Sequence, residues 1–340
     1  MLAELKAEAG RAVLLVARNG DNKLTGIAAL GRHGLLRDPL PILRSWAPAM
    51  MYSGSPLLDR RDPVATLRSI IGAARRHHGA RALLFHRVEA ASPLHEAFVA
   101  TAERHRLPMV GLDRRECAAL DATVDYDTWF EASFPRKRRK ELRRLRARLS
   151  EMGRLESASW SEEKPIDNWI EQFIELERSG WKGKRGTAIG CDEDTPRFLS
   201  TTLRHLAQRG DLLFWRLALD DRPVAMLFGM AGHGRGSLIK IAYDEAFARY
   251  SPGVLIALDA TADLMRRPDI EFVDSCAVPN HPMIDHLWRE RMAFEDILIA
   301  TPGTSPATFA AIAAAERARR KARETLKQLY RRYQSWKGVP

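Results

Sequence analysis

The sequence predicts an α/β (α+β) protein with two lobes, and three observations lead to this prediction. The chain has 340 residues, which is enough for two domains with ordinary hydrophobic cores. Short apolar runs alternate with helical patterns along its length. The second half follows the order α, α, β, β, β, α, β, α, β, so a meander of strands leads into strand–helix–strand units and a mixed central sheet.

In the first half, hairpin and helix-start signals mark the elements. Asn19-Gly20 supplies a tight turn between two apolar runs. Asp62-Pro63 and Ser92-Pro93 each place a capping side chain before a proline, which is typical of a helix start. The predicted strands are 12–17, 24–31 and 81–86, and the predicted helices are 63–78 and 93–105.

The second half begins with a strongly basic helix over 135–152. Leu142, Leu145 and Leu149 recur at helical spacing, and arginines occupy its other faces. The predicted helices that follow are 166–177, 195–209, 252–265 and 281–291, with a long basic amphipathic helix from about 305. The predicted strands are 211–219, 223–230, 237–243, 270–275 and 294–300.

Charge and cysteine usage exclude several classes of protein. The net charge is +11, but the segments 135–154 and 304–340 carry +8 and +7, so the remaining chain is mildly acidic at −4 and the protein is not a uniformly basic nucleic-acid binder. Three cysteines lie far apart without a CxxC pair, which predicts no metal site. No apolar run is long enough to cross a bilayer, and the first ten residues lack a signal-peptide pattern, so we expect a cytoplasmic protein.

The junction from Tyr243 to Gly253 indicates a site for an anionic ligand. A strand ends at Tyr243, and Pro252-Gly253 opens the next helix. The first N–H groups of a helix have no partner within it, and a phosphate can bind them. This junction therefore predicts a donor that carries phosphate, such as an acyl-CoA.

Four motifs in order resemble one family. They are Phe134-Pro135-Arg136-Lys137-Arg138-Arg139-Lys140, Trp181-Lys182-Gly183 with Gly186-Thr187-Ala188-Ile189, Tyr243-Asp244-Glu245 with Tyr250-Ser251-Pro252-Gly253, and Asp274 followed by Trp288. Together they resemble the GNAT-type acetyltransferases of the cellulose-biosynthesis (CelD/BcsL) group, which is related to the Fem-type aminoacyl transferases. The resemblance implies a tandem GNAT-like fold with a degenerate N-terminal lobe in 1–125, a fuller GNAT acyltransferase domain in 126–303, and the basic helix in 304–340.

The resemblance also implies which residues bind the donor. The strand 237–243, with Ile241, supplies a backbone N–H to the thioester carbonyl. Ser251, Pro252, Gly253 and Val254 cradle the pyrophosphate of acetyl-CoA, and no metal is required. At this helix most GNAT enzymes carry Gln/Arg-x-x-Gly-x-Gly/Ala, whereas this chain has Tyr250 and Leu255 at the outer positions.

Candidate catalytic residues lie at the ends of neighbouring strands. Asp244, Asp274 and His281 are each a candidate general base, and each has a structural alternative as a cap of a turn or helix. Tyr243 is a candidate acid for the leaving thiolate or a half-buried strand residue. Trp181 and Lys182 suit a sugar or anionic acceptor, and Arg136 and Lys140 on the basic helix suit phosphate, or else a solvated face.

The predicted function is transfer of an acetyl or other acyl group from acyl-CoA to an amine or hydroxyl, with an amine or a sugar as acceptor. The resemblance links this activity to exopolysaccharide or cell-envelope production. Two alternatives stay open. The basic helices favour a Fem-type transferase that uses aminoacyl-tRNA, and the departure at Tyr250 and Leu255 favours a non-catalytic GNAT-fold binding protein.

Overall fold

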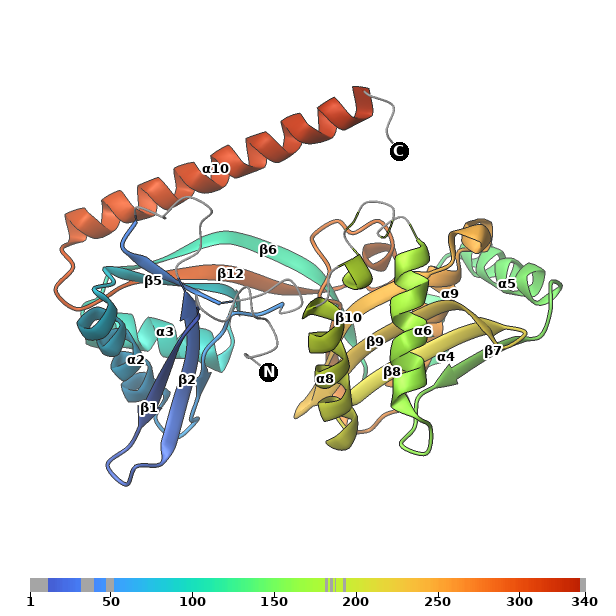
Figure 1. The fold of residues 1–340 in the computed structure, drawn as a ribbon, viewed down its shortest axis with the longest axis horizontal. Coiled ribbons are helices and arrows are strands. Elements are labelled where there is room, and N and C mark those ends of the chain that lie inside the picture. Colours follow the sequence, from blue (N-terminus) through green and yellow to red (C-terminus); the bar gives the residue numbers. More distant parts are fainter. Residues whose placement is uncertain are drawn as a thin grey trace. The chain divides into compact units, whose positions relative to one another are not determined.

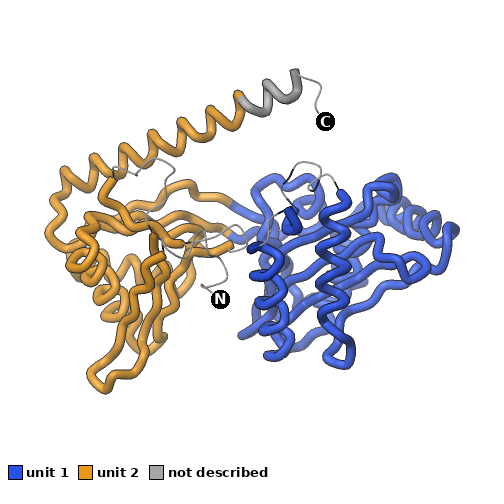
Figure 2. Tube along the Cα trace, in the orientation of Figure 1, with its two compact units in different colours: residues 1–10, 116–292 blue, residues 11–115, 293–340 orange. Residues whose placement is uncertain are grey.

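In the computed structural model the chain forms two compact units (Figures 1 and 2). Among the described residues, unit 1 comprises Glu116–Met292, and unit 2 comprises those from 12 to Arg115 together with those from Ala293 onward. The chain passes from one unit to the other within two strands, β6 (Met109–Asp121) and β12 (Glu290–Ala300). The structure describes residues 12–31, 40–46, 52–180, 183, 186, 188–191 and 194–336, with side chains up to residue 329.

Unit 1 is a mixed sheet with helices on both faces. Its strand order is β6–β11–β10–β9–β8–β7, in which β10 and β11 are parallel and the other neighbours are antiparallel. The strands are β7 (Leu155–Ser159), β8 (Leu212–Leu219), β9 (Arg222–Gly232), β10 (Gly234–Tyr243) and β11 (Ile270–Asp274). The helices are α4 (Tyr126–Ser133), α5 (Arg136–Ser150), α6 (Ile166–Ser179), α8 (Asp194–Gln208) and α9 (Pro252–Leu264).

Successive side chains of β8 point to opposite faces of this sheet and contact different helices. Phe214 packs edge-on against Trp169 and Phe173 of α6. Its neighbour Trp215 points the opposite way, because its indole N–H donates to Asp263 of α9 at 2.8 Å. Figure 1 accordingly shows α6 and α8 over one face, and α9 with α4 and α5 over the other.

Unit 2 repeats this plan with different helices. Its strand order is β1–β2–β3–β5–β12–β6, with β3 parallel to β5 and a short β4 paired to β2. The strands are β1 (Ala12–Arg18), β2 (Leu24–Gly31), β3 (Ile42–Ser45), β4 (Leu57–Leu58) and β5 (Ala82–Glu89). Helices α2 (Pro63–His78) and α3 (Pro93–Arg104) share one core, and α10 (Pro306–Trp336) packs on a second core through Phe309, Ile312 and Ala313.

Each unit therefore has an antiparallel meander, a parallel pair joined by a helical crossover, and an antiparallel strand from the other half of the chain. That last strand is β6 beside β11 in unit 1 and β12 beside β5 in unit 2. The predicted α/β (α+β) class with a mixed sheet is confirmed. The predicted domain boundaries at 125 and 303 stay predictions, and the compact units divide at 115 and 292.

The helix predicted over 281–291 is wrong. Only Ile284–His286 forms a short 3₁₀ helix, η4, and β12 already begins at Glu290. The reason is burial of Leu287 and Trp288 directly before the strand, since the Trp288 indole N–H donates to Thr261 Oγ1 of α9 at 3.0 Å. The sequence analysis also missed β7, α4 and the full extent of β6.

Buried ion pairs hold α10 on unit 2. The fully buried Glu316 accepts from Arg44 of β3 at 2.9 Å and from Arg320 at 2.8 Å. Arg320 also pairs with Asp296 of β12 at 2.8 Å, and His86 and Arg115 each lie 3.0 Å from that carboxylate. Breaking one partner of such a network leaves an uncompensated buried charge, so the contacts act together.

The pKa of Glu316 is about 2, well below its ordinary value. Burial opposes ionisation, but hydrogen bonds from Arg319 and Arg320 and the charge of Arg44 outweigh it. The pKa of Asp296 is lowered too, where His86, Arg115 and the Arg87 N–H outweigh burial. A lowered folded pKa stabilises the fold above the unfolded pKa, and this stabilisation disappears as the pH falls through the folded value.

We therefore expect the thermal unfolding temperature to fall between about pH 5 and about pH 2. Glu316→Gln should lower the unfolding temperature near neutral pH and flatten this acid dependence, because its side chain no longer titrates. Circular dichroism melts across that range test both effects, with Glu324→Gln on the exposed part of the same helix as control. Equal acid dependence in the two variants would contradict the assignment.

Candidate functional site

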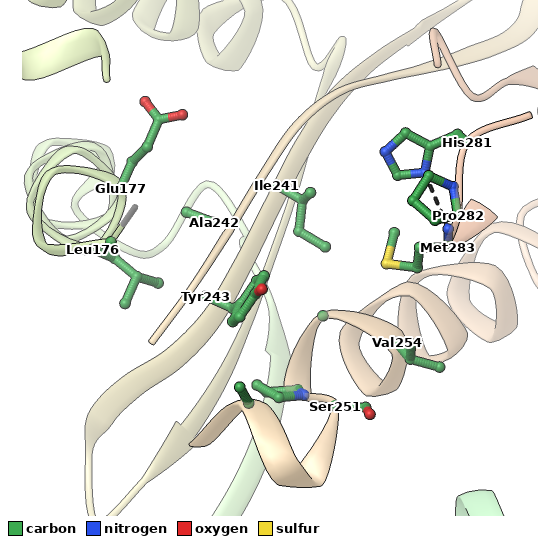
Figure 3. Close-up of a pocket in the computed structure, with 14 residues that line it drawn as sticks. Leu176, Glu177, Ile241, Ala242, Tyr243, Ser251, Val254, His281, Pro282 and Met283 are labelled. Carbon is green, nitrogen blue, oxygen red and sulfur yellow. Dashed lines mark hydrogen bonds between the residues drawn. The ribbon is translucent and has the colours of Figure 1, made fainter. Parts of the chain in front are cut away.

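A cavity of about 410 Å³ opens in unit 1 at the start of α9 (Figure 3). The end of α6 lines one side, the end of β10 the centre, and the segment 281–283 the other side. The lining residues are Leu176, Glu177, Gly180, Ile241, Ala242, Tyr243, Ala248, Ser251, Pro252, Gly253, Val254, His281, Pro282 and Met283. Of the predicted site residues, this cavity brings together Ile241, Tyr243, Ser251, Pro252, Gly253, Val254 and His281.

The cavity exists because β10 and β11 part. Their parallel pairing ends at Ser237 and Asp274, whereas β10 continues beside β9 as far as Tyr243. A bulge between Leu238 and Lys240 accompanies this change. Past Ser237 the second edge of β10 is therefore left without a neighbouring strand in the described sheet, and its last residues line the cavity.

Asp274 turns the chain away at this point. Its Oδ1 accepts the Cys276 N–H at 2.8 Å, and Cys276 has a positive φ of 52°. Such a conformation is costly for a residue other than glycine and is held here by the local hydrogen bond. Asp274 does not line the cavity, and its geometry favours the alternative in which it orients the loop backbone.

The start of α9 keeps one N–H available. Pro252 has no N–H, and the N–H groups of Val254 and Leu255 both donate to the Ser251 carbonyl, at 2.9 and 3.1 Å. Within the described residues, nothing accepts from the Gly253 N–H, and the Ser251 side chain does not cap the helix. Of the residues 252–254, whose amides are predicted to bind the donor, only Gly253 therefore keeps an available N–H. It lies at the N-terminus of the helix, which favours anions.

In unit 2 the corresponding helix is α2, and a side chain caps its first turn. Helix α2 also follows the first strand of a parallel pair and also begins with proline. Its preceding residue Asp62 accepts the Ala65 N–H at 3.1 Å, so a carboxylate of the chain itself occupies the helix start. A side chain of unit 2 therefore takes the place that stays open at the start of α9, and the degenerate N-terminal lobe stays a prediction.

His281 and Asp244 each make the contacts of a cap. His281 Nδ1 accepts the N–H groups of Met283 and Ile284 at 3.3 and 3.4 Å, so in the neutral ring Nε2 carries the proton. Asp244 accepts the Ala246 N–H at 2.9 Å, pairs with Arg222 at 2.7 Å and does not line the cavity. The geometry favours the structural alternative for both, and their roles as bases stay hypotheses.

Sequence reasoning missed Glu177, a buried carboxylate on the cavity wall. Its Oε1 lies 3.0 Å from Lys240 Nζ, and its Oε2 accepts the Ile189 N–H at 3.0 Å. This pair joins α6 to β10 and to the short helix η2 (Ile189–Cys191). The signal was present in the sequence, because Glu177 continues the apolar stripe of Ile170 and Phe173 at helical spacing.

The structure describes two of the four predicted acceptor residues, and neither of these two lines the cavity. Trp181 and Lys182 fall outside the described residues. Arg136 and Lys140 are exposed on α5 and do not line the cavity. Other arginines of that helix form ion pairs, Arg139 with Glu131 and Arg144 with Glu141. Across the described ranges, no helix has the length and apolarity to cross a membrane, and no His, Cys, Asp and Glu cluster suits a metal ion.

Comparison with known proteins identifies the domain that contains this cavity. Residues 136–278 match the family model described as Acetyltransferase (GNAT) domain. No curated protein matches the chain significantly. The family match lies within unit 1 and includes β10, α9 and β11.

Solved structures show the same fold over most of the chain. The C-terminal domain of a putative lysylphosphatidylglycerol synthetase from Agrobacterium fabrum matches with a TM-score of 0.58 and 13% identity, covering 90% of this chain and 87% of that one. FemX matches with a TM-score of 0.55 and 11% identity, over 88% and 91%. A conserved protein of unknown function from Bacteroides thetaiotaomicron matches with a TM-score of 0.54 and 13% identity, over 88% and 90%. The predicted fold class, a tandem GNAT-like α/β fold, is confirmed, and the narrower CelD/BcsL group stays a prediction.

We expect Glu177→Ala to destabilise unit 1 by about 3 kcal/mol, because it removes a buried carboxylate that pairs with Lys240 and accepts the Ile189 N–H. The double variant Glu177→Met with Lys240→Met should recover part of this loss, since both charges are then gone. Urea unfolding of wild type, single and double variants measures the free energies. A single variant as stable as wild type would show that the pair contributes nothing.

Proposed function

We propose that this protein is an acyltransferase that moves an acetyl or other acyl group from acyl-CoA to an amine or hydroxyl acceptor. The observation that supports this proposal most is the cavity at which the end of β10 meets the start of α9, where no side chain caps the helix. Its place inside the segment that matches a GNAT acetyltransferase domain supports it as well.

In this proposal, the two walls bind different parts of the donor. The extended amide arm of CoA lies along the end of β10, where Ile241, Ala242 and Tyr243 line the cavity. The pyrophosphate takes the Gly253 N–H and the Ser251 hydroxyl. A backbone N–H of β10 near Ile241 stabilises the oxyanion that develops on the thioester carbonyl.

The chemical step needs a route for two protons. The acceptor forms its bond to the acyl carbon, the carbon–sulfur bond breaks, and the thiolate leaves. Among the described residues that line the cavity, the only carboxylate is the paired Glu177, and His281 presents a protonated Nε2. We therefore assign removal of the acceptor proton to water and protonation of the thiolate to the Tyr243 hydroxyl.

The acceptor follows from the resemblance alone. The motifs similar to the cellulose-biosynthesis group support an amine or sugar from exopolysaccharide or cell-envelope production. The segment that contains Trp181 and Lys182 continues from Gly180, which lines the cavity, and these two residues are the proposed acceptor contacts.

An aminoacyl-tRNA donor is the second candidate. The exposed cations of α5, such as Arg136 and Lys140, suit a nucleic-acid backbone, and the fold similarity to FemX spans most of the chain. Separate titrations with acetyl-CoA and with charged tRNA distinguish the two donors. Saturable binding of charged tRNA without any binding of acetyl-CoA would select this candidate over the first.

Gly253→Glu should weaken acetyl-CoA binding at least about tenfold, or about 1.4 kcal/mol, because it places a carboxylate where the phosphates bind. A β-carbon at this position would lie 3.5 Å from Tyr243 and 3.6 Å from Ile241, so the fold should tolerate it. Isothermal titration calorimetry measures the affinity. Gly232→Glu is the matched control, since it adds the same charge in open space within unit 1. Equal affinities in both variants would remove Gly253 from the donor site.

Three conservative variants separate the candidate catalytic residues. Tyr243→Phe should lower kcat about tenfold or more while donor affinity is kept, because only the hydroxyl is lost. Asp244→Asn and Asp274→Asn should keep turnover, since an amide oxygen can still accept the capping N–H. Release of free CoA thiol measures the rate. Loss of turnover in either Asn variant would restore that carboxylate as a base, and full activity of Tyr243→Phe would exclude the phenol.

A further inference from the structure

Helix α10 has a packed half and an exposed half. Phe309, Ile312, Ala313 and Glu316 are buried against unit 2. From Lys321 to Leu329 every residue is exposed, although the helix continues without a break to Trp336 (Figure 1). A helical segment of this length is marginally stable in water without a partner surface. The second half therefore presents a surface that no described part of the chain covers.

This exposed half is amphipathic and basic. Leu326 and Leu329 are 66% and 55% exposed and lie three residues apart, so they share one face. Lys321, Arg323 and Lys327 accompany them. The sequence continues this pattern with Tyr330, Tyr333 and Trp336 at helical spacing and with the cations Arg331, Arg332 and Lys337. Over residues 321–340 the only acidic residue is Glu324.

We propose that the segment from Lys321 to Lys337 binds an anionic lipid surface and lies in the plane of the interface. An apolar stripe of leucines flanked by lysine and arginine is the pattern of a helix that inserts one face among lipid headgroups. Tyrosine and tryptophan favour this boundary, because their rings are apolar and their polar tips stay hydrated. The proposal is independent of the acyl-transfer activity.

Charge favours an anionic lipid surface over two other possible partners, a second copy of the chain and a nucleic acid. In a symmetric pairing with a second copy, two strongly basic segments would be brought together, and like charges across such a contact are unfavourable. An anionic lipid surface instead attracts each lysine and arginine near it. Nucleic acid also offers negative charge, but it gives no apolar layer for Leu326 and Leu329.

The test uses the full-length protein and sedimentation with lipid vesicles. We expect binding to phosphatidylcholine vesicles that contain about 30% phosphatidylglycerol, and at least about tenfold weaker binding to phosphatidylcholine alone. Raising NaCl from about 0.1 M to about 0.5 M should weaken the binding, because the charges are exposed. The double variant Leu326→Asp with Leu329→Asp should lose at least about tenfold in affinity for the anionic vesicles.

Two controls keep the result interpretable. Leu57→Asp replaces an equally exposed leucine of unit 2, at 72% exposure, and should bind as wild type does. The Leu326 and Leu329 variant should keep the wild-type unfolding temperature, because both side chains are exposed. No preference for anionic vesicles, or unchanged binding by the double variant, would overturn the proposal. Two other outcomes would also overturn the proposal. One is a dimer in sedimentation velocity that the Leu326 and Leu329 variant abolishes. The other is RNA binding that this variant loses, with no binding to vesicles by the wild-type protein.

Discussion

The separation of β10 from β11 is the constraint on which the candidate site depends. Parallel pairing stops at Ser237 because Asp274, the last residue of β11, holds the following loop in a turn. Among the described strands, β10 then continues beside β9, and its last residues line the cavity. Had the two strands stayed paired to Tyr243, the start of α9 would abut a closed sheet and no ligand could reach the Gly253 N–H.

Three side-chain contacts fix α9 in the position that this site needs. Trp215 of β8 donates to Asp263, and Trp288 donates to Thr261. Asp259 accepts from Arg146 of α5 and from Ser157 of β7. These contacts come from elements far apart in the sequence, and they lie along the helix rather than at its start. The first turn is thereby left free of polar side-chain contacts, which is the condition for binding a ligand there.

The two lobes share a strand topology, but their crossover helices differ in the polar groups at the first turn. In unit 1 the crossover helix begins with an available Gly253 N–H, whereas in unit 2 the carboxylate of Asp62 occupies the equivalent place. The buried charges of unit 2 have another effect, because Glu316 and Arg320 hold α10 against β3 and β12. Unit 1 therefore holds the candidate site, and unit 2 carries a basic helix that is exposed from Lys321 to Leu329.

The sequence by itself determined the α/β class, the helix that starts at Pro252-Gly253, and half of the residues that line the cavity around it. These features are local, because a proline, a glycine and apolar periodicity act within a few residues. Only the tertiary structure decided that β6 and β12 each extend into the other unit and that Glu177 pairs with Lys240. Those outcomes depend on which distant segment lies beside each group, and burial of Trp288 overrode the local helical pattern at 281–291 for the same reason.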